Sequence, residues 1–333
     1  MPISHLHKEF LPAAHGAPPS LRRQGRSTVS ERMPADSLLL SVIIPAYNYA
    51  RLLPRALASV MSQADLRVEL IVVDDGSSDD TPALLREAQT LYGPSLIVLQ
   101  QANAGAASAR NHGLRTCRGR HVLFLDADDE LLPNAVATVL DILAARPSLD
   151  LLLGGNIKCD PDGREKRFMP GSLARQPRQR LKDYLLFKRI AIGHGYMVAS
   201  RRMLQTRWYP EHFRCNEDVP VFAYLLAHGQ VASVPFALAR IHKHPGSLRH
   251  QLAADQEMDL QLVDEVFMGL PENCLDLRSR YCAQRSLSLF RSACLAGKRD
   301  AARGYYRRAL SQDLRQALRL TYLKKALRLW LAR

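Results

Sequence analysis

The three carboxylates Asp126, Asp128 and Asp129 are the residues whose spacing most directly suggests chemistry. They follow the apolar run Val-Leu-Phe-Leu at 122–125, which is typical of a buried strand. Acidic side chains at the carboxyl end of such a strand lie at a sheet edge, where a hard divalent cation and a phosphate can share one site. Extended backbone would also turn Asp126 and Asp128 to the same side. The segment therefore indicates a metal site, while exposed acids that merely end a strand are the equal alternative for a lone Asp-x-Asp.

The elements that must position these carboxylates form a repeated pattern of strand and helix. Short apolar runs predict strands at 41–45, 69–73, 96–99 and 121–125, and each is followed by helical spacing or a helix-opening proline. Four repeats with short turns predict an α/β fold, a mostly parallel sheet with helices on its faces. Such sheets bind ligands at the carboxyl ends of their strands. Polar segments fall at those ends, at 46–48, 74–75, 103–105 and 126–129, so we expect four turns to line one crevice.

Two of these turns carry groups suited to a nucleotide, although each also has a structural explanation. Asp74 and Asp75 offer carboxylates to a base N–H or to ribose hydroxyls, but an Asp-Gly turn with a helix cap uses the same residues. Asn103 and Gly105 belong to a small-residue turn at a helix start, where backbone N–H groups can approach phosphate. Arg110 in that helix could reach the same ligand, and a solvated Arg110 explains the sequence equally well.

Two further groups of titratable residues lie in the second half of the chain, where the strand-helix pattern loosens after residue 150. Glu217 and Asp218 precede a helical stretch at 219–228, so their carboxylates would lie at a helix N-terminus, where negative charge is favoured. His242 and His244 stand in a basic segment. The simpler alternatives are a helix-dipole role for the two acids and an ordinary basic surface loop for the two histidines.

The net charge of +14 comes mostly from one end of the 333-residue chain. Residues 276–333 contain 15 basic and 3 acidic residues, a net charge of +12 that leaves about +2 for the remainder. The six cysteines have neither paired nor zinc-type spacing, which predicts reduced thiols in a cytoplasmic protein. Residues 1–36 contain no apolar stretch of signal-peptide length, and no run approaches the roughly 18 apolar residues of a membrane span. We expect a disordered tail and, at most, peripheral membrane contact.

The motifs taken in order resemble one enzyme family. SVIIPAYN, VVDDGSSDDT, NAGAASARN, FLDADD and NEDVPVF, spread over 41–222, are similar to the motifs of the family 2 glycosyltransferases with the GT-A fold. The resemblance implies an inverting enzyme that moves a sugar from a nucleotide diphosphate sugar, such as a UDP-sugar, to a hydroxyl of a glycan or lipid-linked acceptor. Cell-surface polysaccharide biosynthesis is the implied setting. The expected organisation is a disordered tail at 1–36, a GT-A domain at 37–250 and a helical Arg/Lys-rich region at 251–333.

The resemblance also implies roles for individual residues. The first nucleotide-contacting loop corresponds to Pro45, Tyr47 and Asn48, and the acid that recognises the base, commonly uracil, corresponds to Asp75 with Asp74. In the Asp-x-Asp motif, Asp128 corresponds to the ligand of Mg²⁺ or Mn²⁺, and Asp126 to the residue that helps to hold the nucleotide sugar. Asp218, next to Glu217, corresponds to the general base. A histidine of the closing loop often approaches the metal or diphosphate, and either His242 or His244 could be its equivalent.

The chemistry requires these parts, because the charge that grows on the leaving diphosphate must be neutralised and the acceptor hydroxyl must lose a proton. Two other functions are alternatives. A sugar-nucleotide pyrophosphorylase would need a Gly-rich first loop with Arg and Lys, which the segment 46–49 lacks. A non-catalytic nucleotide-sugar binding protein at a membrane would be favoured by loss of the base, whereas Asp218 is present.

The segment 320–331 has the pattern of an amphipathic helix. Its apolar face consists of Leu320, Leu323, Leu327, Trp330 and Leu331, and its basic face of Lys324, Lys325 and Arg328. An anionic surface on the inner face of a membrane would attract such a helix. Packing of its leucines on the catalytic domain is the equal alternative. Nucleic acid binding is disfavoured, because no recognised motif accompanies the charge.

Overall fold

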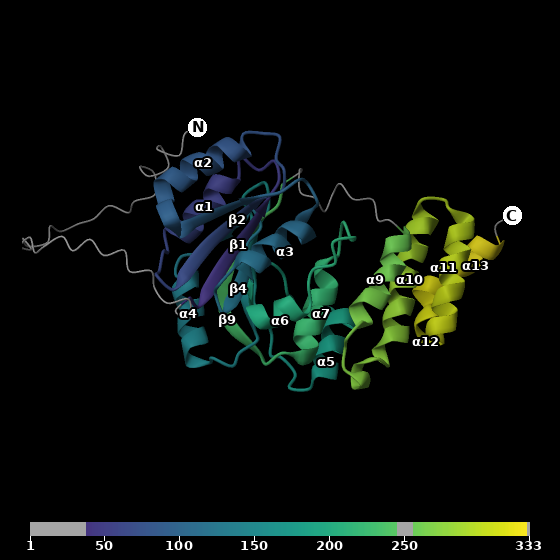
Figure 1. The fold of residues 1–333 in the computed structure, drawn as a ribbon. Helices are drawn as coiled ribbons and strands as arrows, with labels where there is room; N and C mark the ends of the chain where they lie inside the picture. Colours follow the sequence, from purple (N-terminus) through teal and green to yellow (C-terminus); the bar gives the residue numbers. More distant parts are fainter. Residues whose placement is uncertain (1–37, 245–255, 332–333) are drawn as a thin grey trace, which may run out of the picture.

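The computed structural model describes residues 38–244 and 256–331, and the expected tail at 1–36 lies outside them. Figure 1 shows a twisted sheet covered by helices, with a stack of helices at the C-terminal end. The strands are β1 (Leu40–Ala46), β2 (Val68–Asp74), β3 (Leu96–Gln100), β4 (His121–Phe124), β5 (Glu130–Leu131), β6 (Leu151–Cys159), β7 (Glu165–Phe168), β8 (Met197–Ser200) and β9 (Val231–His242).

The helices between the strands are α1 (Leu53–Met61), α2 (Thr81–Tyr92), α3 (Ala106–Thr116), α4 (Ala135–Ala145), α5 (Pro177–Leu181), α6 (Arg201–Thr206) and α7 (Asp218–His228). The C-terminal helices are α9 (Gln256–Phe267), α10 (Leu277–Leu295), α11 (Arg299–Gln312), α12 (Leu314–Ala317) and α13 (Leu320–Leu331). Three short helical turns complete the set: η3 (Gly93–Ser95), η4 (Lys182–Leu186) and η5 (Glu272–Cys274).

Within the described residues, nine strands form one sheet in the order β3-β2-β1-β4-β8-β6-β9-β5, with β7 paired to β6. The first four strands are parallel to one another, as their helical crossovers require. β8 runs antiparallel to β4 and β6, whereas β9 runs parallel to β6. The expected α/β class with a mostly parallel central sheet is confirmed, and the antiparallel β8 is the detail that the strand-helix pattern did not predict.

Both faces of the four parallel strands are covered, which explains their nearly continuous apolar sequences. Alternate residues of β1 point to opposite sides of the sheet. Val42 and Ile44 pack in one core with α1, α2 and α4, whereas Ile43 packs in a second core with α3, α6 and α7. All three side chains are fully buried. Packing on both faces therefore holds the four strands, and with them the loops at their carboxyl ends, in place.

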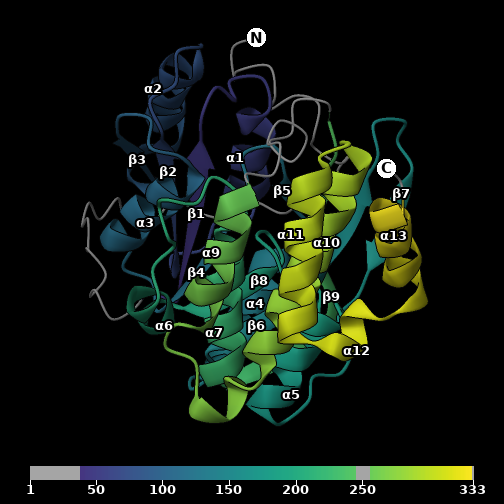
Figure 2. The same cartoon turned by 90° about the vertical axis from the view of Figure 1, so that its right-hand side faces the viewer.

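The C-terminal helices share a hydrophobic core with the sheet-containing part. Val263 of α9 and Leu277 of α10 belong to one buried cluster with Ala223 and Ala227 of α7. Figure 2 shows α9 and α7 lying side by side. α7 begins at Asp218. The helix that carries this carboxylate therefore packs against the C-terminal helices α9 and α10. The boundary predicted at residue 250 lies outside the described residues.

The last helices form a separate core of their own. Phe290 of α10, Tyr306 of α11 and Ala326 of α13 are buried together. α13 therefore packs through Ala326, and two leucines of its predicted apolar face, Leu320 and Leu327, are 70% and 51% exposed. No helix in 38–244 or 256–331 is both long enough and apolar enough to cross a membrane.

Candidate active site

The carboxyl ends of the four parallel strands meet at one edge of the sheet. Their register places Ala46 beside Asp74 and Asp74 beside Gln100. β1 also pairs with β4 through Ile43 and Phe124. The loops that follow these strands are therefore neighbours, and they carry most of the residues that the sequence singled out.

The loop after β1 is fastened to the loop after β2 by Asn48. Its backbone lies in the left-handed region, at φ +58°. Its side-chain oxygen accepts hydrogen bonds from the backbone N–H groups of Ser78 (2.8 Å) and Asp79 (3.3 Å). Pro45 is still part of β1, and Tyr47 is 44% exposed. Asn48 thus shapes the loop, and the Tyr47 ring remains at the surface of the strand edge.

Asp75 holds the loop that follows β3. Its carboxylate accepts hydrogen bonds from Gln101 Nε2 (2.7 Å) and from the backbone N–H groups of Ala104 (2.9 Å) and Gly105 (2.8 Å). Like Asp74, it is only 3% exposed. A carboxylate offers about four lone-pair directions, so one remains for an N–H of a bound base. The visible role of Asp75 is structural, and it is compatible with the expected contact to a base.

Gly76 allows the loops after β2 and β3 to approach each other. Its φ is +73°, and a Cβ built on it would lie 2.7 Å from the backbone nitrogen of Asn103. Asn103 itself is exposed at the loop tip. Asp74, at the end of β2, accepts a hydrogen bond of 3.0 Å from the Ser77 N–H. This segment is therefore an Asp-Gly turn that also contacts the loop after β3. The structural explanation for Asp74 and Asp75 is thus compatible with a place in the site.

Arg110 lies inside the site and is not solvated. The residue is 5% exposed, and its guanidinium donates to Glu217 Oε1 (2.8 Å) and to Asp126 Oδ1 (3.1 Å). Burial acts to lower the pKa of Arg110, but the charges of Asp126 and Glu217 raise it above its ordinary value. One buried cation therefore connects the acidic segment after β4 with the acids that open α7.

The three carboxylates after β4 repel one another. Asp129 is 4% exposed, and burial together with the charges of Asp126 and Asp128 raises its pKa to about 8. Burial and the charge of Asp126 also raise the pKa of Asp128. Charge repulsion of this kind is relieved by a bound cation or by protonation. The segment is thus electrostatically suited to receive a cation.

The two candidate histidines take different partners. His244 Nε2 lies 2.8 Å from Asp128 Oδ2, and its ring meets that of Tyr49 edge to face at 6.3 Å. His242 Nε2 lies 3.1 Å from Glu130 Oε1 instead, on the β5–β9 side. Of the two histidines, His244 is the one beside the Asp-x-Asp motif.

The donor atoms near Asp128 fit a cation that arrives with a substrate. Among the described residues, no three His, Cys, Asp or Glu side chains form a group able to hold a metal ion by themselves. Mg²⁺ is commonly bound by one or two carboxylates together with substrate phosphates and water, and not by a cage of protein ligands. Asp128 with Asp126, and His244 beside them, supply a donor set of that open kind.

Asp218 is the first residue of α7, directly after Glu217. Asn216 makes the turn into the helix with φ +60°. Burial and the charge of Glu217 raise the pKa of Asp218 to about 6, against the opposing effect of Arg110. Burial, together with the charge of Asp218, raises the pKa of Tyr281 of α10. A carboxylate with this pKa is ionised at neutral pH and can still accept a proton.

Two residues that the sequence did not single out complete these contacts. His194 Nε2 lies 3.1 Å from the Tyr209 hydroxyl, and its Nδ1 lies 4.0 Å from Asp126 Oδ1. The Arg110 guanidinium lies over the Tyr209 ring, 5.6 Å from its centre. The Asn111 side chain holds Tyr209 in place: its Nδ2 donates to the Tyr209 carbonyl oxygen at 2.8 Å, and its Oδ1 accepts from the Tyr209 N–H at 3.0 Å.

One sequence signal could have located His194. It stands between two glycines, of which Gly195 is required by its left-handed backbone. Gly195 has φ +82°, and a Cβ on Gly193 would lie 2.5 Å from the Tyr196 hydroxyl. Histidine in such a constrained loop is more informative than histidine in an exposed basic segment. Tyr209 carries no comparable signal.

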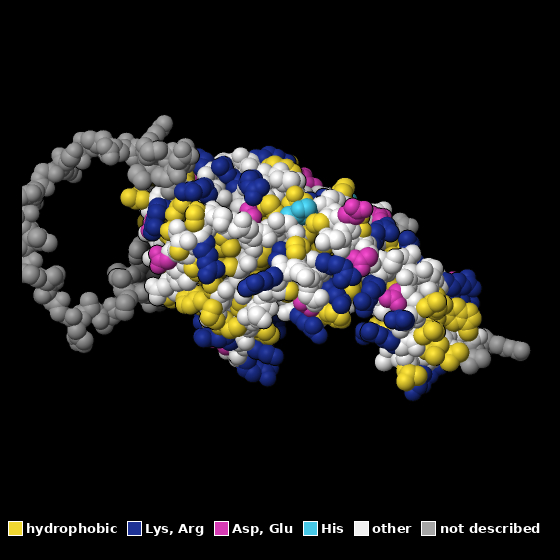
Figure 3. Space-filling model, turned by 90° about the horizontal axis from the view of Figure 1, so that it is seen from below, with side chains coloured by type: hydrophobic (Ala, Val, Ile, Leu, Met, Phe, Trp, Pro, Cys, Tyr) yellow, Lys and Arg dark blue, Asp and Glu magenta, His cyan; other side chains and the backbone are white. Residues whose placement is uncertain are grey.

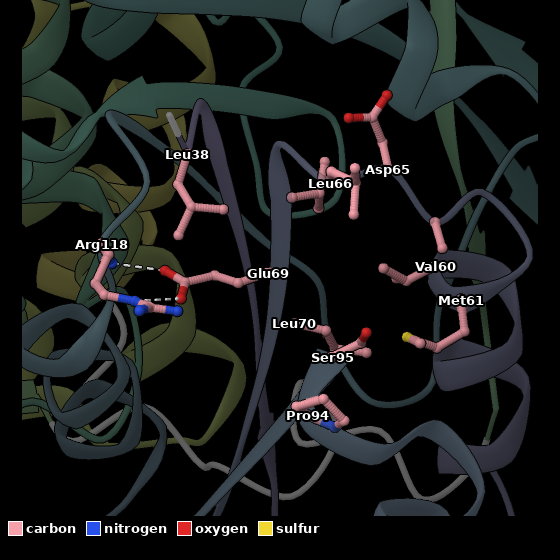
Figure 4. A pocket seen from close by; sticks show the side chains of 12 residues that line it. Leu38, Val60, Met61, Asp65, Leu66, Glu69, Leu70, Pro94, Ser95 and Arg118 are labelled. Carbon is pink, nitrogen blue, oxygen red and sulfur yellow. Dashed lines mark hydrogen bonds and ion pairs between the residues drawn. The ribbon is translucent and has the colours of Figure 1, made fainter. Parts of the chain in front are cut away.

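The pocket in Figure 4 lies at the other end of the sheet. It has a volume of about 630 Å³ and is lined by residues that include Leu38, Val60, Leu66 and Glu69. Glu69 is near the amino end of β2 and pairs with Arg118. The pocket is therefore separated by the length of the strands from the acidic cluster and takes no part in the site.

Comparison with known proteins identifies the family. The model of glycosyl transferase family 2 matches residues 41–208. The succinoglycan biosynthesis protein ExoO of Rhizobium meliloti is 31% identical over 267 residues, which are 76% of this chain and 74% of that protein. A Campylobacter jejuni GalNAc(5)-diNAcBac-PP-undecaprenol beta-1,3-glucosyltransferase is 32% identical over 54% of this chain and 57% of its own length. The chondroitin synthase of Escherichia coli is 36% identical, but this chain covers only 22% of it.

A solved structure supports the fold independently. The structure of residues 1–349 of TarS from S. aureus aligns with a TM-score of 0.61 over 84% of this chain and 82% of its own, at 20% identity. The order of the motifs, the parallel strands that end in them and the matched family model agree with one another. The chain belongs to glycosyltransferase family 2 and is a glycosyltransferase.

Proposed function

We propose that this enzyme transfers a sugar from a UDP-sugar to a hydroxyl group of a glycan or lipid-linked acceptor, with inversion at the anomeric carbon. The observation that carries the proposal is the pair of ion pairs made by Arg110, with Asp126 and with Glu217. These contacts bring the acidic segment after β4 and the N-terminus of α7 to two nitrogens of one buried guanidinium. The first suits a leaving diphosphate, and the second suits an incoming hydroxyl.

The donor would lie on the loops after β1 to β4. Asp75 has a lone-pair direction left for a base N–H, and the exposed Tyr47 ring stands at the same edge. The backbone N–H groups of Ala104 and Gly105 already donate to Asp75, so a phosphate at this turn would be contacted by the first turn of α3. Structures similar to this chain at TM-scores of 0.55 and 0.56 are those of TarS with UDP and with UDP-GlcNAc. They support UDP as the first nucleotide to test.

Asp126, Asp128 and His244 are the residues that would hold Mg²⁺ or Mn²⁺ together with the diphosphate. A cation bound there supplies Lewis-acid neutralisation of the charge that develops on the leaving group. Arg110 adds a fixed positive charge beside Asp126 in a buried setting, where electrostatic interactions are stronger than in water. The carboxylates of Asp126 and Asp128 and the guanidinium of Arg110 would thus lie where negative charge develops on the leaving diphosphate.

Asp218 is the proposed general base. Its pKa of about 6 leaves it ionised at neutral pH, yet close enough to accept the proton of an attacking hydroxyl. Glu217 is held by Arg110 and is therefore the less available of the two acids. One base on the face opposite the leaving group suits direct displacement, which inverts the anomeric configuration.

The acceptor is proposed from the relatives. The Campylobacter jejuni relative is named for an acceptor linked to PP-undecaprenol, and the Rhizobium meliloti relative for succinoglycan biosynthesis. Both names favour a growing cell-surface glycan, free or lipid-linked. Membership of the family argues against the pyrophosphorylase alternative, and the presence of Asp218 argues against a silent binding protein.

A panel of nucleotide sugars tests the proposal. The purified chain with Mn²⁺ should release UDP from at least one UDP-sugar, slowly with water and faster with a suitable glycan acceptor. Chelation with EDTA should abolish the release, and added Mn²⁺ should restore it. Release of UDP that is unaffected by chelation would contradict the metal role, and release of the sugar 1-phosphate would contradict glycosyl transfer.

A further inference from the structure

The last two helices present a group of exposed apolar side chains. Within the described residues, α12 with its C-cap and α13 carry five large ones: Leu314 (60% exposed), Leu318 (50%), Leu320 (70%), Leu327 (51%) and Trp330 (41%). Figure 3 shows apolar side chains gathered beside basic ones at the end of the molecule formed by the last helices. Single exposed leucines are ordinary, but several on neighbouring helices mark a surface that contacts something.

α13 leaves these side chains exposed because it packs through a different face. Ala326 is buried, and Tyr322 and Leu329 are partly buried against the same cluster. These residues are four and three positions apart, which places them on one side of the helix. Leu320 and Leu327 lie outside that set. The helix is therefore anchored through this side, and Leu320 and Leu327 face outward.

Trp330 stands at the border of this surface. Its ring lies 5.8 Å from that of Tyr306 and 5.9 Å from the Arg303 guanidinium. Arg303 also reaches the Leu329 carbonyl oxygen at 3.4 Å. The indole is fixed at one edge and 41% exposed at the other. An amphipathic ring held in this way is suited to the boundary between water and an apolar phase.

The charge within the two helices is entirely positive, although Asp313 precedes α12 and Asp300 pairs with Arg303 beside Trp330. Residues 314–331 contain five cations, Arg315, Arg319, Lys324, Lys325 and Arg328, and no Asp or Glu. All five are exposed, and none forms an ion pair with a carboxylate in the described part of the chain. A partner that covers the leucines must therefore also bring negative charge.

This charge decides between two kinds of partner. In a symmetric dimer the same patch would meet itself, so that the five cations of one copy would face five cations of the other. Repulsion opposes that arrangement, whereas an anionic lipid surface supplies both an apolar layer for the leucines and phosphates for the cations. The pattern of charge and exposure favours the lipid.

We propose that the surface formed by α12 and α13 docks on an anionic lipid bilayer, with the leucines and Trp330 at the boundary between headgroups and acyl chains. The arginines and lysines beside them contact lipid phosphates. The proposal goes beyond glycosyl transfer and does not depend on it, because vesicle binding is measured without donor or acceptor. Failure of either proposal would leave the other standing.

Sedimentation with vesicles tests the docking surface. The full chain should bind vesicles that contain 30% phosphatidylglycerol, should bind pure phosphatidylcholine much more weakly, and should be released as salt is raised. Leu320→Gln with Leu327→Gln should weaken binding about tenfold or more, because less apolar surface enters the boundary. Lys324→Gln, Lys325→Gln and Arg328→Gln together should weaken it about 100-fold, at roughly fivefold for each charge.

Matched variants elsewhere control for composition. Leu66 precedes β2 and is 80% exposed, so Leu66→Gln should leave binding unchanged. Lys166→Gln, Arg167→Gln and Arg175→Gln together remove the same number of exposed charges from the region of β7. This set should bind vesicles nearly as well as the wild type. Circular dichroism and thermal melting check that each variant is folded.

Three results would overturn the proposal. The first is a wild-type chain that does not bind anionic vesicles. The second is equal loss of binding in the control and α13 variants, which would indicate a general charge effect. The third is a dimer in light scattering that the leucine variants turn into a monomer, without any effect on vesicles, which would assign the surface to a second copy.

Discussion

The two sides of the candidate site are built in different ways. On the proposed donor side, polar residues lie at the ends of the parallel strands, and Asn48 and Asp75 fasten their loops to the next loop by hydrogen bonds. On the acceptor side, Tyr209 and Glu217 come from the loosely patterned second half and are joined to the sheet edge through Arg110. Hydrogen bonds between loops shape the proposed donor side, whereas buried side chains, chiefly Arg110 and Asn111, hold the proposed acceptor side.

This difference predicts different failures. Loss of one loop contact on the proposed donor side should weaken ligand binding but cost little stability, because the other hydrogen bonds between the loops remain. Loss of Arg110 should leave the mostly buried Glu217 without this ion pair and remove one partner of Asp126, which costs more than loss of an exposed pair.

Replacement of the proposed base should have the largest effect on activity. Asp218→Asn removes the proton acceptor but keeps the shape of the helix start, so transfer should fall by about 10²- to 10⁴-fold. Binding of UDP, measured by calorimetry, should stay within about twofold, because the donor side is separate. Asp162→Asn, on an exposed turn, is the matched control. Unchanged turnover in Asp218→Asn would remove this residue from the role of base.

Removal of the buried cation should have the largest effect on stability. Arg110→Ala leaves Glu217 without this ion pair and removes one partner of Asp126, and the free energy of unfolding should fall by about 3–5 kcal/mol. Arg115 on the same helix pairs with Glu211 at 3.5 Å, with side chains 58% and 43% exposed. Arg115→Ala should cost about 1 kcal/mol or less. Equal losses in urea denaturation would contradict the special role of Arg110.

A side chain at Gly76 should disturb the donor side by a smaller amount. Gly76→Ala forces a Cβ to within 2.7 Å of the Asn103 nitrogen at a positive φ, so stability should fall by about 2–3 kcal/mol and UDP binding should weaken. Gly163 has φ +80° with nothing within 4 Å. Gly163→Ala should therefore show only the backbone cost of about 1 kcal/mol. Equal effects would show that the contact between the two loops is unimportant.

The smallest effect concerns pH. Activity of the wild type should decline as pH falls below about 6, because Asp218 takes up a proton there. The charge of Glu217 raises this pKa, so Glu217→Gln should lower it and move the acid limb of kcat/KM down by about 0.5–1 pH unit. Glu211→Gln, at an exposed pair, should leave the limb in place. A shift to higher pH in Glu217→Gln would contradict the electrostatic account.

The donor side could be predicted from the sequence to a large extent. The predicted strands at 41–45 and 69–73 differ from β1 and β2 by one residue at each end, because strands buried on both faces have unmistakable apolar runs. The parallel arrangement then placed the loops beside one another. What the sequence could not decide was whether Asp75 faces a ligand or the protein, since both uses need the same residue.

The acceptor side could be predicted only in part. Glu217 and Asp218 were found from their place before a helix, but Arg110 was equally well explained as solvated, because burial of an arginine depends on partners more than 100 residues away. The two glycines beside His194 are a weak local signal, whereas the importance of Tyr209 arises from packing alone, so the sequence pattern singles out neither residue. The choice between His242 and His244 likewise required the position of β9 relative to β5.

The central claim is that the acidic segment after β4 holds a nucleoside diphosphate through a divalent cation. Calorimetric titration of UDP into the wild type and into Asp128→Asn, each with Mn²⁺ and with EDTA, tests it most directly. The account predicts that UDP binds the wild type at least tenfold more tightly with Mn²⁺ than with EDTA, and that Asp128→Asn loses most of this difference. Equal affinity of the wild type for UDP with Mn²⁺ and with EDTA would contradict it.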